Sequence, residues 1–137
     1  GWGMYYRLLD EMPKVGETKE ANDMNSFEPV EFMGNPQPQL SEQQDKFGWY
    51  RTRLRLGASD EERYLYFPAV LGRAWIFLDG RAAACKEAPG EAHMVVRLDG
   101  VPAGEHILEV VIQNVNREWL KAGILAPVAL RTGKPGE

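Results

Sequence analysis

The chain has 137 residues and carries 16 Lys and Arg against 20 Asp and Glu, which gives a formal net charge of −4. A (β/α)₈ barrel needs about 200 residues or more, so the chain is too short to hold a barrel enzyme. We expect no nucleic-acid partner, because binding to phosphates depends on a basic surface that this charge balance does not provide.

Residues 1–46 are polar and rich in proline, and only two short runs in this part are strand-like: Met4–Leu9 and Phe27–Met33. Pro29 restricts the second run to a sheet edge or a bulge, because proline has no N–H to donate to a strand ladder. We therefore expect an irregular N-terminal segment that wraps an edge of the fold.

From Phe47 onward, short apolar runs recur about every ten residues and are separated by Gly, Pro and Asp. Within the runs, apolar residues alternate with others at a period of two, as strands with one buried face require. No long segment repeats at helical spacing. The inward-facing sets are expected to be Tyr50, Thr52, Leu54 and Leu56; Ala74, Ile76 and Leu78; Met94, Val96 and Leu98; and Leu108, Val110 and Ile112.

This pattern predicts an all-β protein, an antiparallel β-sandwich of jelly-roll type with about eight strands in two sheets. Asp79-Gly80 predicts a tight hairpin, because both residues readily adopt positive φ. We expect one domain over 1–137, composed of the irregular segment 1–46, a sandwich core at 47–131 and a tail at 132–137.

The sequence leaves the cellular compartment unknown. No apolar stretch approaches the roughly 18 residues of a membrane span, and no signal peptide is visible, so we expect no membrane partner. The single cysteine, Cys85, cannot form an intramolecular disulfide and therefore reports no redox compartment. We expect its thiol to be buried or half-buried.

Catalytic and metal-binding patterns are scarce. Nucleophile elbows and phosphate loops are absent, and no spacing selects a carboxylate pair from the 20 acids. His93 and His106 lack the companions of a zinc site. The acidic run at 60–62 (Asp60, Glu61 and Glu62) could supply oxygens to a structural calcium ion, with a solvated loop as the alternative. We expect no catalytic residues and no other cofactor.

The candidate sugar site lies in a polar segment near the end of the chain, where Trp119 follows Asn116 and Arg117. A flat ring covers the apolar C–H face of a pyranose, while neighbouring polar groups pair with its hydroxyls. Trp75, which shares the outward face of its strand with Phe77, is the second candidate. The alternative for these rings is packing against a sheet or a neighbouring domain.

Arg51, Arg53 and Arg55 form a stripe on the outward face of one strand. We expect a solvated face with glutamate partners on the neighbouring strand. The alternative is binding of a carboxylated glycan, because arginine meets a carboxylate through two parallel hydrogen bonds.

Three segments together resemble the galactose-binding-type jelly-roll domain of β-galactosidases. They are FGWYRTRLRL at 47–56, GRAWIFLDG at 72–80 and VIQNVNREWLKAGI at 111–124. They occur in the order of that family, cover roughly residues 47–130, and are most similar to glycoside hydrolase family 35 and more loosely to family 2. The chain departs from the pattern where the family has Asp, Glu and Gly, at Gly72, Gln113 and Asn116 respectively.

The resemblance implies a non-catalytic accessory domain whose partners are carbohydrate and the catalytic barrel of a glycoside hydrolase. A second hypothesis is a purely structural domain that docks on the barrel or another chain without sugar affinity. A third is a self-standing enzyme, such as a small lyase on a jelly roll.

Overall fold

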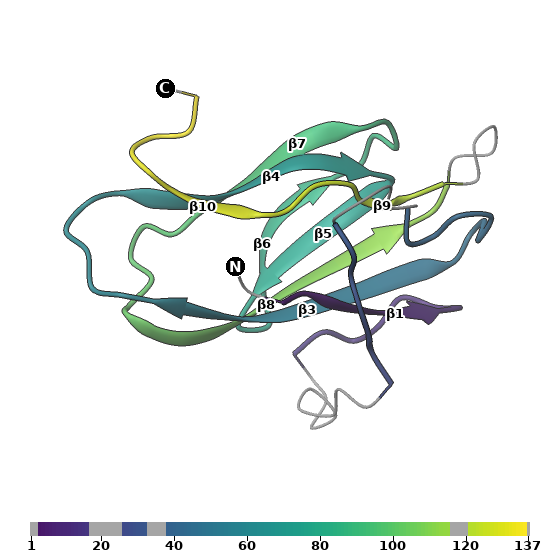
Figure 1. Ribbon diagram of the computed structural model, residues 1–137, viewed down its shortest axis with the longest axis horizontal. Coiled ribbons are helices and arrows are strands. Elements are labelled where there is room, and N and C mark those ends of the chain that lie inside the picture. Colours follow the sequence, from purple (N-terminus) through teal and green to yellow (C-terminus); the bar gives the residue numbers. More distant parts are fainter. Residues whose placement is uncertain (1–2, 17–25, 33–37, 116–120, 137) are drawn as a thin grey trace.

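The computed structural model describes residues 3–16, 26–32, 38–115 and 121–136, and this part of the chain is all β-structure (Figure 1). It contains no helix that could cross a membrane. Its strands are β1 (Tyr5–Leu9), β2 (Glu28–Pro29), β3 (Phe47–Leu56), β4 (Arg63–Leu71), β5 (Arg73–Leu78), β6 (Arg81–Lys86), β7 (Ala92–Arg97), β8 (Gly104–Gln113), β9 (Gly123–Ile124) and β10 (Ala129–Thr132).

The strands form two antiparallel sheets, which confirms the predicted β-sandwich. The larger sheet has the order β2-β1-β3-β8-β5-β6, and the smaller has the order β10-β4-β7, with β9 paired to β4. From β3 to β8 the chain crosses between the sheets at every connection except the β5–β6 hairpin. That hairpin turns at Asp79-Gly80, where both residues have positive φ (52° and 81°), as predicted.

The core lies between the sheets and is built by the predicted alternation. The predicted inward side chains all belong to one apolar cluster or pack against it, apart from Thr52. Thr52 is buried as well, and its hydroxyl donates to the carbonyl of Gly3 at 2.5 Å. Leu78, the last residue of β5, packs against the cluster but is only partly buried.

Strand β4 is the centre of the smaller sheet, yet its sequence does not alternate regularly. Leu65, Phe67 and Val70 all reach the core, because a bulge between Phe67 and Val70 shifts the register by one residue. Pro68 sits in this bulge, where its missing N–H costs no ladder bond.

At one end of the sandwich, the side chain of His106 on β8 contacts the β5–β6 turn and the loop between β7 and β8. Its Nδ1 lies 2.5 Å from Asp79 Oδ2, and its Nε2 lies 2.7 Å from the carbonyl oxygen of Pro102. Both ring nitrogens therefore face oxygen acceptors, which favours the doubly protonated ring. The hydrogen bonds to Asp79 and to Pro102 raise the pKa of His106, while burial and the charge of Arg63 oppose the shift.

We expect the contacts of His106 to contribute less to the free energy of unfolding in mildly alkaline solution. A His pKa raised above 6.5 contributes stability that is complete below pH 6.5 and is lost as pH rises through the folded-state pKa. Relative to His106→Gln, the native chain should lose about 1 kcal/mol of unfolding free energy between about pH 6 and about pH 9. Urea unfolding of both proteins measures this difference, and a constant difference across that range would contradict the charged-ring assignment.

Candidate functional site

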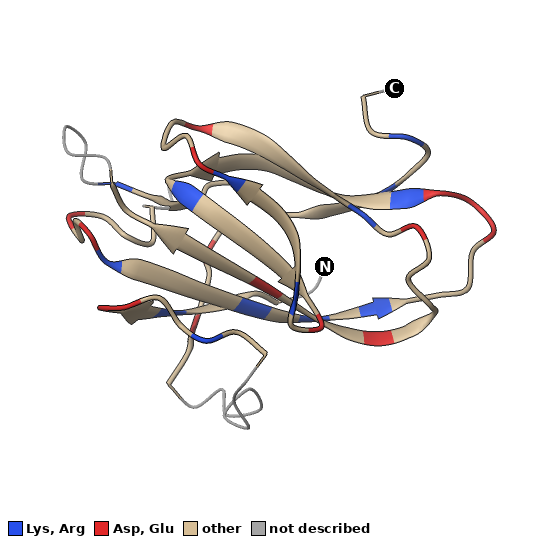
Figure 2. Ribbon diagram, turned by 180° about the vertical axis from the view of Figure 1, so that it is seen from behind, with Lys and Arg blue, Asp and Glu red and all other residues tan. Residues whose placement is uncertain are grey.

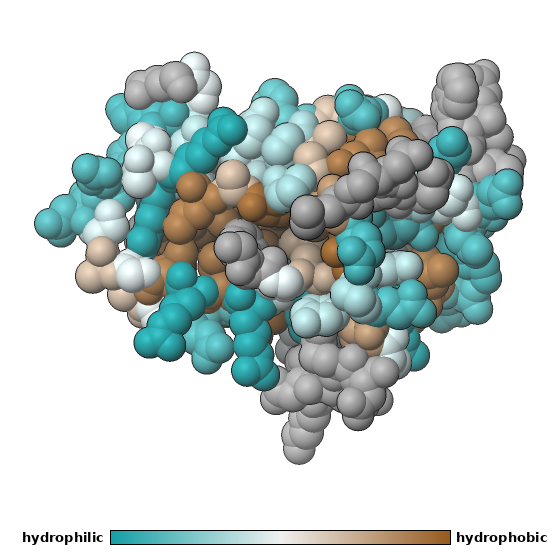
Figure 3. All heavy atoms as spheres, viewed as in Figure 1, coloured by the Kyte–Doolittle hydropathy of each residue, from teal (hydrophilic) through white to brown (hydrophobic). Residues whose placement is uncertain are grey.

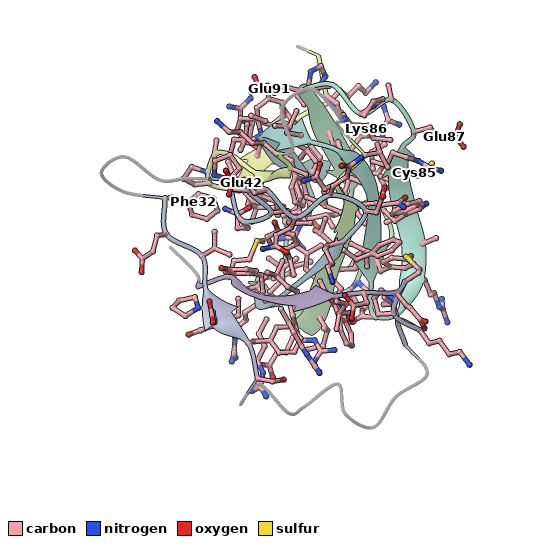
Figure 4. All side chains as sticks on the ribbon, turned by 90° about the vertical axis from the view of Figure 1, so that its right-hand side faces the viewer. Phe32, Glu42, Cys85, Lys86, Glu87 and Glu91 are labelled. Atoms are coloured by element: carbon pink, nitrogen blue, oxygen red, sulfur yellow. The ribbon has the colours of Figure 1, made fainter. Side chains whose placement is uncertain are left out.

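Three of the four predicted sugar-binding residues, Asn116, Arg117 and Trp119, lie outside the described residues. In the sequence they belong to the connection between β8 and β9, and β8 reaches this connection at the end of the sandwich opposite His106. Figure 4 looks onto this end, where Glu42 and Lys86 lie close to the strand ends and Glu87 points away from the protein. The residues that hold the two ends of the β8–β9 connection lie within the described structure.

The β8 side of the connection is held by Asn114, which is fully buried. Its side-chain Nδ2 donates to the carbonyl of Leu40 at 2.9 Å. Its backbone N–H donates to the carbonyl of Lys46 at 3.0 Å, and its own carbonyl accepts from Asp45 at 2.8 Å. These three hydrogen bonds join the end of β8 to segment 38–46.

The β9 side is held by the side chain of Gln39. The N–H of Ile124 donates to Gln39 Oε1 at 2.8 Å, and Gln39 Nε2 donates to the carbonyl of Ile124 at 3.1 Å. The side-chain amide of Gln39 thus pairs with both backbone groups of Ile124, as a residue on a neighbouring strand would do. The Tyr50 hydroxyl also donates to Gln39 Oε1 at 2.7 Å, and burial raises the pKa of Tyr50 well above its usual value, so it remains a donor. No pattern in the sequence indicated Gln39.

Gly72, which connects β4 to β5, explains one departure from the resembled family. Its φ is +108°, and a Cβ there would meet Ile112 Cγ2 at 2.8 Å and Gln113 O at 2.9 Å. The family's Asp would not fit this backbone. Lys86 donates to the Gly72 carbonyl at 2.7 Å, and burial lowers the pKa of Lys86.

Trp75 lies on the outward face of the larger sheet and is half-buried. It packs against a second apolar cluster that contains Trp49 and Val111. The guanidinium carbon of Arg73 lies 5.3 Å from the centre of its ring, so one side of Trp75 already faces a cation. The structure thus places Trp75 in a packing arrangement, and a sugar contact for it stays a prediction.

Cys85, opposite Trp75 on β6, is exposed, so the expectation of a buried or half-buried thiol is wrong. It lies on β6, the last strand of the larger sheet, and no further strand within the described residues pairs with this edge. Figure 4 shows its sulfur at the outer edge of the molecule.

The expectation of a solvated arginine stripe is wrong for Arg51 and holds for Arg53 and Arg55, which are exposed. Arg51 and its cross-strand partner Glu109 are each 3% exposed, with Nη2 and Oε2 3.0 Å apart. Arg53 and Glu105 remain well exposed, at a nitrogen–oxygen distance of 3.9 Å. The predicted glutamate partner on the neighbouring strand is confirmed for Arg51 and for Arg53.

The burial of Arg51 comes from the N-terminal part of the chain. Phe27 lies edge-on to Trp49 and stacks against the guanidinium, whose carbon is 5.3 Å from the Phe27 ring centre. Trp49 Nε1 donates to the same Glu109 oxygen at 2.8 Å. Further back, the backbone of Gly16 reaches the Asp79-Gly80 turn. The N-terminal segment therefore covers the outward face of the larger sheet as well as pairing with its edge.

The acidic loop at 60–62 lies at the same end as His106. It lines a cleft of about 340 Å³ together with Asp99 and Val101. Figure 2 shows the acidic residues of this loop together at that end. Within the described residues, no three acidic, histidine or cysteine side chains come together as a metal site.

Comparison with known proteins gives a structural match and no sequence match. No protein-family model matches the chain. No curated protein matches it either. Among solved structures, it is similar to a β-glucuronidase from an uncultured Clostridium species, with 18% identity and a TM-score of 0.72. That match covers 98% of this chain and 28% of the other.

Two further matches agree. A Ruminococcus gnavus β-glucuronidase in complex with uronic deoxynojirimycin gives 14% identity and a TM-score of 0.69, over 94% of this chain and 28% of that one. A glycosyl hydrolase family 2 member from Bacteroides cellulosilyticus gives 16% identity and 0.66, over 96% and 20%. At these identities the likeness establishes a shared fold. The chain spans only about a quarter of the length of these enzymes.

Proposed function

We propose that the chain is a non-catalytic, carbohydrate-binding accessory domain of a glycoside hydrolase. The observation that carries this proposal is the coverage: nearly the whole chain matches a 28% piece of a β-glucuronidase. The relation to family 2 rests on the same matches, while the β-galactosidase resemblance stays a prediction from the sequence motifs. The scarcity of catalytic patterns supports the assignment of hydrolysis to another part of such an enzyme.

The proposed sugar site is the β8–β9 connection, with Trp119 stacking on a pyranose and Asn116 and Arg117 binding its hydroxyls. Calorimetric titration with galactosides and β-glucuronides should give a measurable affinity. Replacing Trp119 by Ala should weaken it about tenfold or more, since loss of an aromatic platform removes its buried contact area.

The matched control is Tyr5→Ala, which removes an aromatic ring that is 40% exposed on β1, away from this end. Equal losses in the two variants would overturn the site, and hydrolysis of chromogenic glycosides by the purified chain would overturn the non-catalytic assignment.

A specific observation favours the structural alternative. Leu130 on β10 and Leu8 on β1 point to the inner side of their sheets, yet they are 44% and 40% exposed. Figure 3 shows hydrophobic surface on this face of the molecule, bordered by hydrophilic residues. A docking domain would use these exposed leucines and bind none of the sugars.

A further inference from the structure

The outward face of the smaller sheet has a charge pattern unlike the rest of the chain. Strands β4, β7 and β10 contain no Asp or Glu, although the chain has 20 of them. Each of the three strands carries one arginine (Arg63, Arg97 and Arg131), and β7 adds His93. Alternation places Arg97, Arg131 and His93 on the outward face, whereas Arg63 lies on the side of the core residue Leu65.

Two of these arginines lie in one row across the sheet. Tyr64, on the central strand β4, is the cross-strand partner of both Arg97 and Arg131. Neighbouring strands are about 4.8 Å apart, so the two arginine backbones are separated by about 10 Å. Tyr64 is only 5% exposed although it lies outside the core cluster, as expected for a ring between two long side chains.

The next outward residue of β4 holds one guanidinium in place. The guanidinium carbon of Arg131 lies 4.0 Å from the centre of the Tyr66 ring. On this same face the ring of His93 lies 5.8 Å from that of Tyr66. A guanidinium stacked on a ring keeps its N–H groups directed outward in its plane, which is the arrangement that binds a carboxylate through two parallel hydrogen bonds.

The charges of Arg97 and Arg131 are not neutralised by a carboxylate within the described structure. Both side chains are exposed, and neither makes an ion pair with a described residue. Arg53, on the larger sheet, instead faces Glu105. The smaller sheet therefore presents two arginines whose backbones are about 10 Å apart, with Tyr64 between them and Tyr66 beside Arg131.

We propose that this face, formed by Arg97, Arg131, Tyr64, Tyr66 and His93, binds an oligosaccharide that carries carboxylate groups. The guanidinium groups would take the carboxylates, and the tyrosine rings would cover apolar sugar surface. The acidic loop at 60–62 lies beyond the Arg63 end of β4 and repels anions, so the ligand extends toward His93. This inference rests on the proposed carbohydrate-binding function and names its substrate class.

The test uses the whole chain and calorimetric titration with a short oligogalacturonate, a neutral oligogalactoside of the same length, and a single-stranded oligonucleotide. The double variant R97A/R131A should bind the oligogalacturonate about tenfold or more weakly. The variant R53A, which removes an exposed arginine from the other sheet, should bind it normally. Circular dichroism and thermal unfolding check that each variant is folded, and Arg131→Lys tests whether the planar guanidinium is needed.

The outcomes separate the two proposals. Binding of the neutral sugar without the oligogalacturonate would overturn this inference and leave the proposed function standing. If neither sugar binds, both this inference and the proposed function are overturned. If R53A and R97A/R131A weaken binding of the oligogalacturonate equally, the attraction of anions is nonspecific and this inference alone is overturned. The same holds if the oligonucleotide binds more tightly than the oligogalacturonate.

Discussion

Replacing Glu109 by Gln is expected to lower the free energy of unfolding by about 3–5 kcal/mol, because it removes one charge from a buried ion pair. Gln has nearly the same shape as Glu and still accepts a hydrogen bond from Trp49. Arg51, which is 3% exposed, would nevertheless lose the carboxylate 3.0 Å from its Nη2. Urea unfolding followed by tryptophan fluorescence measures the change.

The matched control is the exposed pair on the same two strands. Glu105→Gln removes the carboxylate 3.9 Å from Arg53, and it should cost less than about 1 kcal/mol because water screens exposed charges. The double variant Arg51→Met with Glu109→Leu should recover much of the stability lost in Glu109→Gln, since no buried charge then remains. Similar effects of Glu109→Gln and Glu105→Gln would contradict the importance of burial.

Replacing Gly72 by Ala is expected to cost about 3 kcal/mol or more. Two effects add: the positive φ of 108° is unfavourable for a residue with a Cβ, and that Cβ would overlap Ile112 and the Gln113 carbonyl. Gly72→Asp, which restores the residue of the resembled family, should cost at least as much. Thermal and urea unfolding measure both variants.

Two other glycines separate these effects. Gly100 has a φ of +76° with open space around it, so Gly100→Ala should show the conformational cost alone, about 1 kcal/mol. Gly90 has open space and no positive φ, so Gly90→Ala should change stability by less than about 1 kcal/mol. If all three alanine variants were equally stable, the prediction that a Cβ at Gly72 overlaps its neighbours would be contradicted.

Much of the fold could be predicted because the period of two is a local property. The inward faces of β3, β5, β7 and β8 follow from alternation alone, and the Asp79-Gly80 turn from residue preference. Strand β4 was not singled out, because its bulge and Pro68 break the alternation. The burial of Arg51 could not be predicted either, since the ring that covers it, Phe27, comes from a distant part of the chain.

The site was less accessible to prediction. The sequence indicated Trp119 and its polar neighbours by composition, and these residues lie outside the described part of the chain. The side chains that hold the ends of that loop, Gln39 and Asn114, bind backbone atoms far away in sequence. Such contacts leave no periodic signal. The arginines of β7 and β10 were visible in the sequence, but only the strand order places them on either side of Tyr64.

The pairing of β3 with β8 has a consequence for the growing chain. These strands form the longest ladder of the larger sheet, from Phe47 with Gln113 to Leu56 with Gly104. During synthesis, β3 therefore waits for most of the later strands before its central partner exists. Its outward row of aromatic and arginine side chains can meet Phe27 much earlier, so the N-terminal segment is available to shield this strand from other chains in the meantime.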